Sequence, residues 1–358
     1  MGESYGNLAA QRAHHERAPM ARRTYPHAQL DLFEAAPVEK SAQVVASVAV
    51  SPELMALRYR LPSHLYLGTS SWAFAGWRGL IFAADAAENQ LARHGLAAYA
   101  QHPLLRTVGI DRTYYAPIPA ADFAAYAAAV PDDFRFLVKA HELCTLASFR
   151  STGRYVHRSG ERNALFLEPA YATDHVVGPY IEGLEAKAGS LLWQFPPQNV
   201  PALGGAQRFA ERLYVFLRAL PRGPLYAVEL RNRELLTPSY AAALADAGAV
   251  HCLNVHPTMP PIHEQQRLAR SASTPALVIR WMLHPRHRYE AAKVRYQPFN
   301  RIVDDDPLHR DTIAALCLDA TAAGRAAFVI VNNKAEGSAP LTVCKLAERL
   351  VEIRRTSQ

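Results

Sequence analysis

The chain has 358 residues, of which 50% are hydrophobic and 20% are charged, and this balance is typical of a folded protein with a sizeable core and excludes wholesale disorder. The 39 Lys and Arg residues against 32 Asp and Glu give a net charge of +7, which favours anionic partners, although the basic residues are spread along the chain. Neither a membrane-spanning apolar run nor a signal peptide is recognisable, so we predict a cytoplasmic protein with no membrane partner.

Residues 1–62 mix Ala, Arg, His and Pro with no sustained period, apart from a short amphipathic stretch at residues 30–36. We therefore expect residues 1–62 to be an N-terminal extension that is partly disordered, and residues 63–358 to be the folded domain. The four cysteines are scattered without a CxxC pair, which predicts buried free thiols in a reducing compartment.

From Leu65 onward, short apolar runs of strand length alternate with Ala- and Leu-rich stretches of helix length. Strands are predicted at Leu65–Thr69, Thr107–Ile110, Phe136–Lys139, Leu191–Gln194, Tyr226–Glu229, Val250–Val255, Leu277–Trp281 and Ala327–Val331. Helices are predicted at Leu91–Gln101, Ala121–Ala129, Tyr180–Lys187, Gln207–Leu220, Pro238–Ala247, Leu308–Ala323 and Ala339–Arg354. Thr237 before Pro238 is a typical N-cap, and Gly324 is a typical glycine at a helix end.

Eight nearly continuous apolar strands that alternate with helices predict an α/β fold, a parallel (β/α)8 barrel of the TIM type. An open doubly wound sheet is the alternative. The absence of GxGxxG after any strand and of GxxxxGK[ST] makes this alternative less favourable, because open nucleotide-binding sheets usually carry such phosphate loops.

The active site of such a barrel lies at the carboxyl ends of its strands, so the polar residues that end each apolar run are the site candidates. We predict three catalytic residues, Glu229, Lys139 and Asp111. The predicted substrate-binding residues are Trp72, Tyr115, Gln194, Arg231, Arg280, Asn332 and Asn333.

Glu229 and Arg231 are two residues apart, so their side chains point to the same face and form either a structural ion pair or a shared ligand site. Lys139 ends an apolar strand, where burial would lower its pKa. It is then a base, a Schiff-base amine or an anion contact, or it forms a salt bridge with Glu229. Asp111 and Glu229 are the best carboxylate pair for acid–base chemistry.

No cofactor is predicted. His141, His256 and His284 could in principle join a carboxylate in binding a divalent metal, but no HExxH motif or close His pair supports this. Trp72, Phe74, Trp77, Tyr114 and Tyr115 either stack on a sugar ring or a base or pack against the barrel rim. The N-terminus of the helix after Gly337 and Pro340 could receive an anion, or Ser338 is merely its N-cap.

Four motifs in order, GTSSW at 68–72, WQFPP at 193–197, VELRN at 228–232 and VNNK at 331–334, resemble the domain of unknown function 72 family, also called YecE-like. The resemblance runs from about Leu65 to Arg354 and implies a parallel β/α barrel. The activity of the family is not established.

Two segments depart from the family pattern. VGIDRTYY stands where the family resembles VEIN-T-FY, which places Gly109 at the position of an acid and Asp111 at that of an amide. The seventh strand resembles RFHG in the family, whereas here Trp281 and Met282 follow Arg280 and His284 is displaced by two. If the missing acid and histidine are catalytic, this member is divergent or inactive.

The leading hypothesis is an enzyme, a hydrolase or a lyase, that acts on a small polar, anionic or phosphorylated ligand. Lys139, Arg231 and Arg280 would hold the anion, and Glu229 would act as acid or base. The alternatives are a nucleic-acid-binding barrel, with Trp72, Trp77 and Tyr115 stacking on bases, and a non-catalytic scaffold. The sequence does not predict the oligomeric state.

Overall fold

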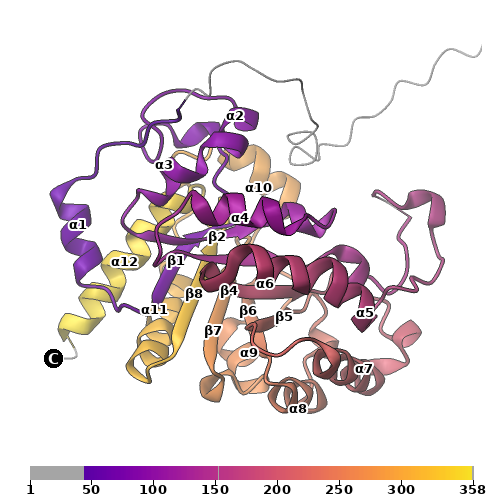
Figure 1. Ribbon diagram of the computed structural model, residues 1–358. Coiled ribbons are helices and arrows are strands. Elements are labelled where there is room, and N and C mark those ends of the chain that lie inside the picture. The colour runs from indigo at the N-terminus through magenta and orange to yellow at the C-terminus, as the bar shows by residue number, and fades with distance from the viewer. Residues whose placement is uncertain (1–43, 152, 357–358) are drawn as a thin grey trace, which may run out of the picture.

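A computed structural model describes residues 44–151 and 153–356, which contain a closed barrel of eight parallel strands (Figure 1). The strands are β1 (Leu65–Thr69), β2 (Leu105–Ile110), β3 (Arg135–Lys139), β4 (Ala188–Gln194), β5 (Tyr226–Glu229), β6 (Val250–Val255), β7 (Ala276–Trp281) and β8 (Ala326–Val331). Each strand pairs with the next in the chain, and β8 pairs with β1, so the sheet has no open edge. The predicted barrel is confirmed, and the open-sheet alternative is wrong.

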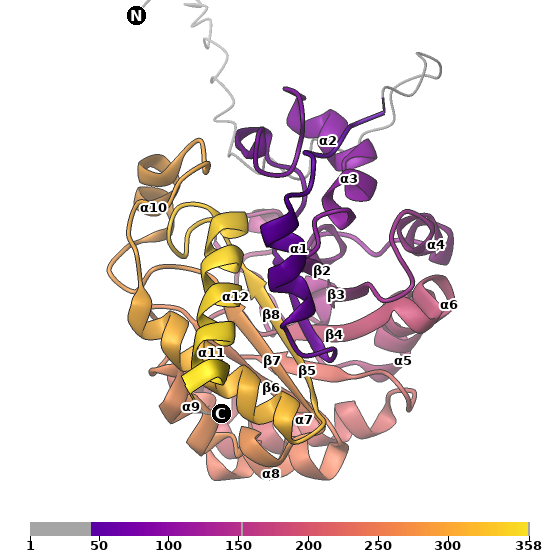
Figure 2. The same cartoon turned by 90° about the vertical axis from the view of Figure 1, so that its left-hand side faces the viewer.

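Helices surround the barrel on its outer side in both ribbon views (Figures 1 and 2). The described residues form α1 (Pro52–Tyr59), α2 (Glu88–His94), α3 (Leu96–Ala100), α4 (Ala120–Ala128), α5 (Pro169–Ala172), α6 (Gly178–Leu184), α7 (Gly205–Ala219), α8 (Pro238–Ala247), α9 (Ile262–Leu268), α10 (Tyr289–Tyr296), α11 (Pro307–Ala322) and α12 (Ala339–Thr356). None of these helices has the length and apolar character needed to cross a membrane.

The predicted helix ends are confirmed for two helices. The Thr237 hydroxyl accepts a hydrogen bond from the Tyr240 N–H at 3.2 Å at the start of α8. Gly324 follows Ala323, the C-cap residue of α11, with a φ of +72°, a conformation that glycine adopts without steric cost.

The helices differ from the prediction in several segments. The helix expected at 91–101 is two helices, α2 and α3, with Gly95 between them. The apolar periodicity also did not indicate α5, α9 and α10, which are short. Within the predicted extension, residues 44–62 contain α1, and the Val48 N–H donates to the Ile81 carbonyl at 2.9 Å; the stretch at 30–36 lies outside the described residues.

Two apolar layers explain why the strands are apolar on both faces. Along a strand, alternate side chains face the barrel interior and the surrounding helices. The larger cluster packs between the sheet and the helices. The interior is filled by a separate cluster of Leu137, Leu192, Ala227, Val250, Cys252, Val278, Phe328 and Ile330.

The interior positions continue into a polar layer at the carboxyl ends of the strands. Because side chains two residues apart share a face, the residue that follows an interior apolar residue by two positions also points inward. Leu137 is thus followed by Lys139, Val278 by Arg280 and Ile330 by Asn332. The strand period therefore gathers the predicted site residues above the apolar interior.

Candidate functional site

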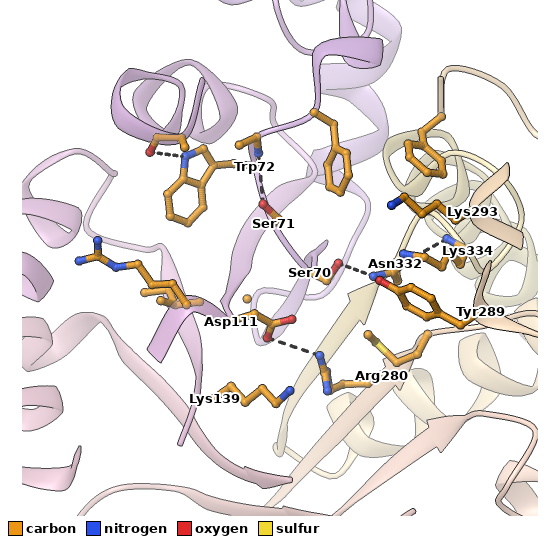
Figure 3. A pocket seen from close by; sticks show the side chains of 18 of the residues that line it. Ser70, Ser71, Trp72, Asp111, Lys139, Arg280, Tyr289, Lys293, Asn332 and Lys334 are labelled. Carbon is orange, nitrogen blue, oxygen red and sulfur yellow. Dashed lines mark hydrogen bonds and ion pairs between the residues drawn. The ribbon is translucent and has the colours of Figure 1, made fainter. Parts of the chain in front are cut away.

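A cavity of about 430 Å³ opens at the carboxyl ends of the strands, where α2 and α10 lie at the same end of the barrel (Figures 2 and 3). It brings together eight of the ten predicted site residues. These are Asp111, Lys139, Trp72, Tyr115, Gln194, Arg231, Arg280 and Asn332.

Glu229 lies beneath the cavity rather than in its lining, and its side chain is fully buried. Its Oε2 accepts a hydrogen bond from Arg280 Nη1 at 2.6 Å, and its Oε1 forms an ion pair with Arg231. Burial alone would raise the pKa of Glu229, but the charges of Arg231 and Arg280 outweigh it and lower the pKa to about 2. Glu229 is thus a permanent anion that holds the two arginines in place.

Arg280 stands between the two carboxylates that the sequence suggested as an acid–base pair. Its Nη2 lies 3.5 Å from Asp111 Oδ1 on one side, while Nη1 binds Glu229 on the other. Nη1 also donates to Gln194 Oε1 at 3.2 Å, which fixes the guanidinium in a single orientation. Of these two carboxylates, Asp111 alone faces the cavity, so Asp111 and Glu229 do not flank a ligand as a pair (Figure 3).

Lys139 is buried on the cavity floor, 8% exposed, with Tyr114 beside it. Its Nζ lies 3.5 Å from the centre of the Tyr114 ring, a cation–π contact. Among the described residues no carboxylate lies within ion-pair distance, so the predicted salt bridge to Glu229 is not formed. Burial lowers the pKa of Lys139 to about 8, which the charge of Asp111 opposes. A fraction of the lysine is therefore a neutral amine near pH 7.

A second lysine, Lys334, lies on the wall that β1, β8 and α10 form. It is 7% exposed, and its Nζ lies 3.4 Å from Asn332 Oδ1 and 4.3 Å from the centre of the Tyr289 ring. Burial and the neighbouring charge of Lys293 lower the pKa of Lys334 to about 8. Asn332 also donates through Nδ2 to Ser70 Oγ at 2.9 Å, which joins the ends of β8 and β1.

The predicted aromatic residues differ in how much of each side chain is exposed to the cavity. Trp72 is 5% exposed, and its indole N–H donates to the Leu91 carbonyl at 3.1 Å. Trp77 is fully buried, with its N–H donating to Asn333 Oδ1 at 3.3 Å. Tyr115 lines the cavity, where burial and then the charge of Asp111 raise its pKa to about 12. Packing against the rim therefore describes both tryptophans.

Asn333 does not line the cavity. Its Oδ1 accepts a hydrogen bond from the Ala339 N–H at 2.8 Å, at the first residue of α12. Asn333 thus accepts a hydrogen bond from a backbone N–H at the start of this helix, the role that the sequence suggested for Ser338. The Ser338 hydroxyl has no hydrogen-bond partner among the described residues.

Positive charge dominates the cavity lining. Two carboxylates, Asp111 and Glu88, face six cationic side chains, namely Lys139, Lys293, Lys334, Arg112, Arg231 and Arg280. Arg112 pairs with Asp122, and Arg231 and Arg280 share Glu229. The three lysines have no carboxylate within ion-pair distance in the part of the chain that the structure describes, so they supply the excess charge.

Both departures from the family pattern concern this cavity. Gly109 and Met282 line the cavity, so these departures change the shape of the cavity rather than the barrel that carries it. A Cβ at Gly109 would lie 3.1 Å from the Ser70 carbonyl oxygen, a tight contact that a side chain there must accommodate. His284 does not line the cavity. Its backbone N–H donates to the Lys334 carbonyl at 2.9 Å and so supports the wall on which Lys334 lies.

Two lining residues of α10, Tyr289 and Lys293, were not among the predicted site residues. The sequence signal that could have indicated them is the basic, aromatic segment after β7. This segment lies several residues beyond the end of the strand, where site residues were not expected. The described residues include no group of three or more His, Cys, Asp or Glu side chains arranged to hold a metal ion.

The chain is similar to several solved structures, of which the first named here supports the barrel assignment. A DUF72 family protein from Enterococcus faecalis is 18% identical with a TM-score of 0.54, over 80% of this chain and 95% of that one. A DUF72 family protein from Thermotoga maritima is 17% identical with a TM-score of 0.49, over 81% and 99%. A methyltransferase from Methanosarcina mazei is 13% identical with a TM-score of 0.47, over 85% and 97%.

The comparison with curated proteins returns no match. The family model described as "Protein of unknown function DUF72" matches residues 66–358, which is most of the sequence and includes all four motifs and the cavity residues. The resemblance is confirmed: this chain belongs to the DUF72 family, whose activity is unknown.

Proposed function

We propose that this chain is an enzyme that acts on a small anionic molecule, of the phosphorylated kind, in the cavity at the carboxyl ends of the strands. Lys139 is the base of this reaction. The observation that carries the proposal is a buried lysine whose pKa is lowered to about 8, without a carboxylate partner among the described residues, on the floor of a cationic cavity. A group that is partly neutral near pH 7 is suited to proton transfer.

The chemistry that fits these groups is that of a lyase. The neutral Lys139 amine takes a proton from a substrate carbon next to a carbonyl group; the C–H electron pair forms a C=C bond, and the π pair of the carbonyl moves onto its oxygen. The guanidinium groups of Arg231 and Arg280 stabilise the negative charge that develops there. The enolate then re-forms the carbonyl and expels a leaving group from the adjacent carbon, and the Lys139 ammonium returns its proton to the departing group. Asp111 lies 3.5 Å from Arg280, and its charge raises the proton affinity of Lys139.

The small-molecule proposal is favoured over nucleic-acid binding by the placement of the tryptophans. Trp77 is fully buried, and Trp72, although it contributes to the cavity lining, is only 5% exposed, so two of the three aromatic side chains expected to stack on bases present little or no open ring face. The cysteines Cys144, Cys252 and Cys317 are buried free thiols, which supports our proposal of a cytoplasmic location.

Metabolite profiling tests this proposal even while the identity of the substrate is open, because a whole cell extract is offered to the protein. We expect wild-type protein to consume at least one anionic compound of the extract, while the variant Lys139→Met consumes none. Lys345→Met is the matched control, since it removes the same charge from a surface lysine paired with Asp305.

A lyase gives products whose masses sum to that of the substrate, whereas a hydrolase adds the mass of one water. Identical extracts after treatment with wild type and Lys139→Met would overturn the assignment of Lys139 as the base.

A further inference from the structure

Four of the six cationic groups of the cavity fall into two sets on different sides. Figure 3 shows Lys139 and Arg280 on one side, Lys293 and Lys334 on the other, and Asp111 and Ser70 between them. The first set comes from β3 and β7, while the second comes from α10 and the loop that follows β8. A ligand with one charged end and one reacting end would meet both sets.

In the part of the chain that the structure describes, no carboxylate lies within ion-pair distance of the second set. Lys334 is buried, and among the described residues its ammonium group has one polar contact, with Asn332 Oδ1 at 3.4 Å. The Lys293 charge repels Lys334, while Glu290 and Asp111 attract Lys334, and Glu88 attracts Lys293, only from beyond ion-pair distance. Two like charges on one wall are unfavourable unless an anion lies between them.

A hydroxyl donor faces the same space. Ser70 Oγ accepts the hydrogen bond from Asn332 Nδ2 at 2.9 Å, and its own hydrogen has no acceptor among the described residues. Ser70 lines the cavity together with Lys293 and Lys334. Two ammonium groups and a hydroxyl supply donors for the oxygens of a doubly charged phosphoryl group.

The position of this set agrees with a general property of β/α barrels, in which a phosphate is frequently bound by the loops after the seventh and eighth strands. Lys293 belongs to α10, which follows β7, and Lys334 lies three residues after β8.

We propose that Lys293, Lys334 and Ser70 form a phosphate-anchoring subsite, and that the substrate is a phosphomonoester whose reacting part lies over Lys139. This inference rests on the proposed function, which it extends by naming the substrate class. The anchor holds the phosphate, Asn332 orients Ser70, and Asp111 lies at the boundary between the anchor and the reacting centre.

Titration with inorganic phosphate tests the anchor. A hydrogen bond to a charged group contributes about 1.5–3 kcal/mol, so we expect the dissociation constant for phosphate to rise about tenfold or more in Lys334→Met. We expect a smaller rise in Lys293→Met and in Ser70→Ala, no change in Lys345→Met, and less than about a threefold rise in Lys139→Met. Ser70→Ala removes a single hydroxyl and keeps the test valid if Lys334→Met does not fold.

Wild-type phosphate affinity in both Lys334→Met and Ser70→Ala would overturn the subsite, and so would a larger loss in Lys139→Met. A second titration, with glycerol 3-phosphate, separates the two sources of the anion. Tighter binding of this ester than of inorganic phosphate supports the substrate class, whereas tighter binding of inorganic phosphate overturns it. Failure of the anchor leaves the profiling result with Lys139→Met intact, so the two proposals fail independently.

Discussion

Replacing Glu229 with glutamine is expected to lower the free energy of unfolding by about 3–5 kcal/mol, because it leaves two buried arginines without their shared carboxylate. Arg280 keeps contacts with Gln194 and Asp111, whereas Arg231 loses its one ion pair among the described residues. A typical domain is stable by about 5–15 kcal/mol, so this loss is readily measured by urea denaturation.

The matched control is Asp111→Asn, which removes the other carboxylate near Arg280. That contact is longer, at 3.5 Å, and the Asp111 side chain is 19% exposed, so its loss should cost less than about 1 kcal/mol. The Glu229 contribution is present above the ordinary glutamate pKa and is lost as the pH falls toward 2, because the folded-state pKa is the lower one. A stable Glu229→Gln protein that has lost all turnover would instead favour Glu229 as a catalytic acid or base.

Replacing Lys139 with methionine is expected to stabilise the protein and abolish its turnover. Burial lowers the pKa of this lysine from 10.5 to about 8, so folding carries a cost on the order of 3 kcal/mol while the lysine is protonated. Methionine has a similar length and no charge, so the variant should unfold at higher urea concentration at pH 7. Turnover should fall by about 100- to 10,000-fold, the usual contribution of a general base.

The stability difference depends on pH with a defined sign. Below pH 8 both the folded and the unfolded wild type hold the proton of Lys139, and the cost is complete. Between pH 8 and about 10.4 the unfolded state binds more protons, so the wild type gains stability as the pH rises and the advantage of Lys139→Met shrinks. Lys345→Met should show neither effect. A Lys139→Met protein less stable than wild type at pH 7 would contradict this account.

The strands were predictable because burial on both faces leaves runs of apolar residues that are hard to mistake. Leu65–Thr69, Tyr226–Glu229 and Val250–Val255 match β1, β5 and β6 residue for residue. The short helices were not predictable. In α10 the sequence YEAAKVRY carries no sustained apolar stripe, because one face covers the cavity and the other is exposed.

The floor of the site was predictable for the same reason as the strands. Lys139, Gln194 and Arg280 are the residues at which an inward-facing apolar row becomes polar, and the alternation places them together. Glu229 and Asn333 have separate roles because of how far each side chain lies from the cavity, which a sequence pattern does not show. Glu229 ends β5 and Asn333 follows β8 by two residues, yet Glu229 lies below the cavity and Asn333 binds the first N–H of α12. Lys293 reaches the wall through tertiary packing of a loop helix.

A pH titration of the Lys139 side-chain amine tests directly whether Lys139 is partly neutral near pH 7. The titration is followed through the 15N chemical shift of the amine, and its signal is assigned by its absence in Lys139→Met. We expect a midpoint near pH 8, which rises when glycerol 3-phosphate is added because the bound anion favours the charged ammonium. A midpoint above pH 10 that the phosphate ester does not move would contradict the claim that this cavity holds a reactive lysine for an anionic substrate.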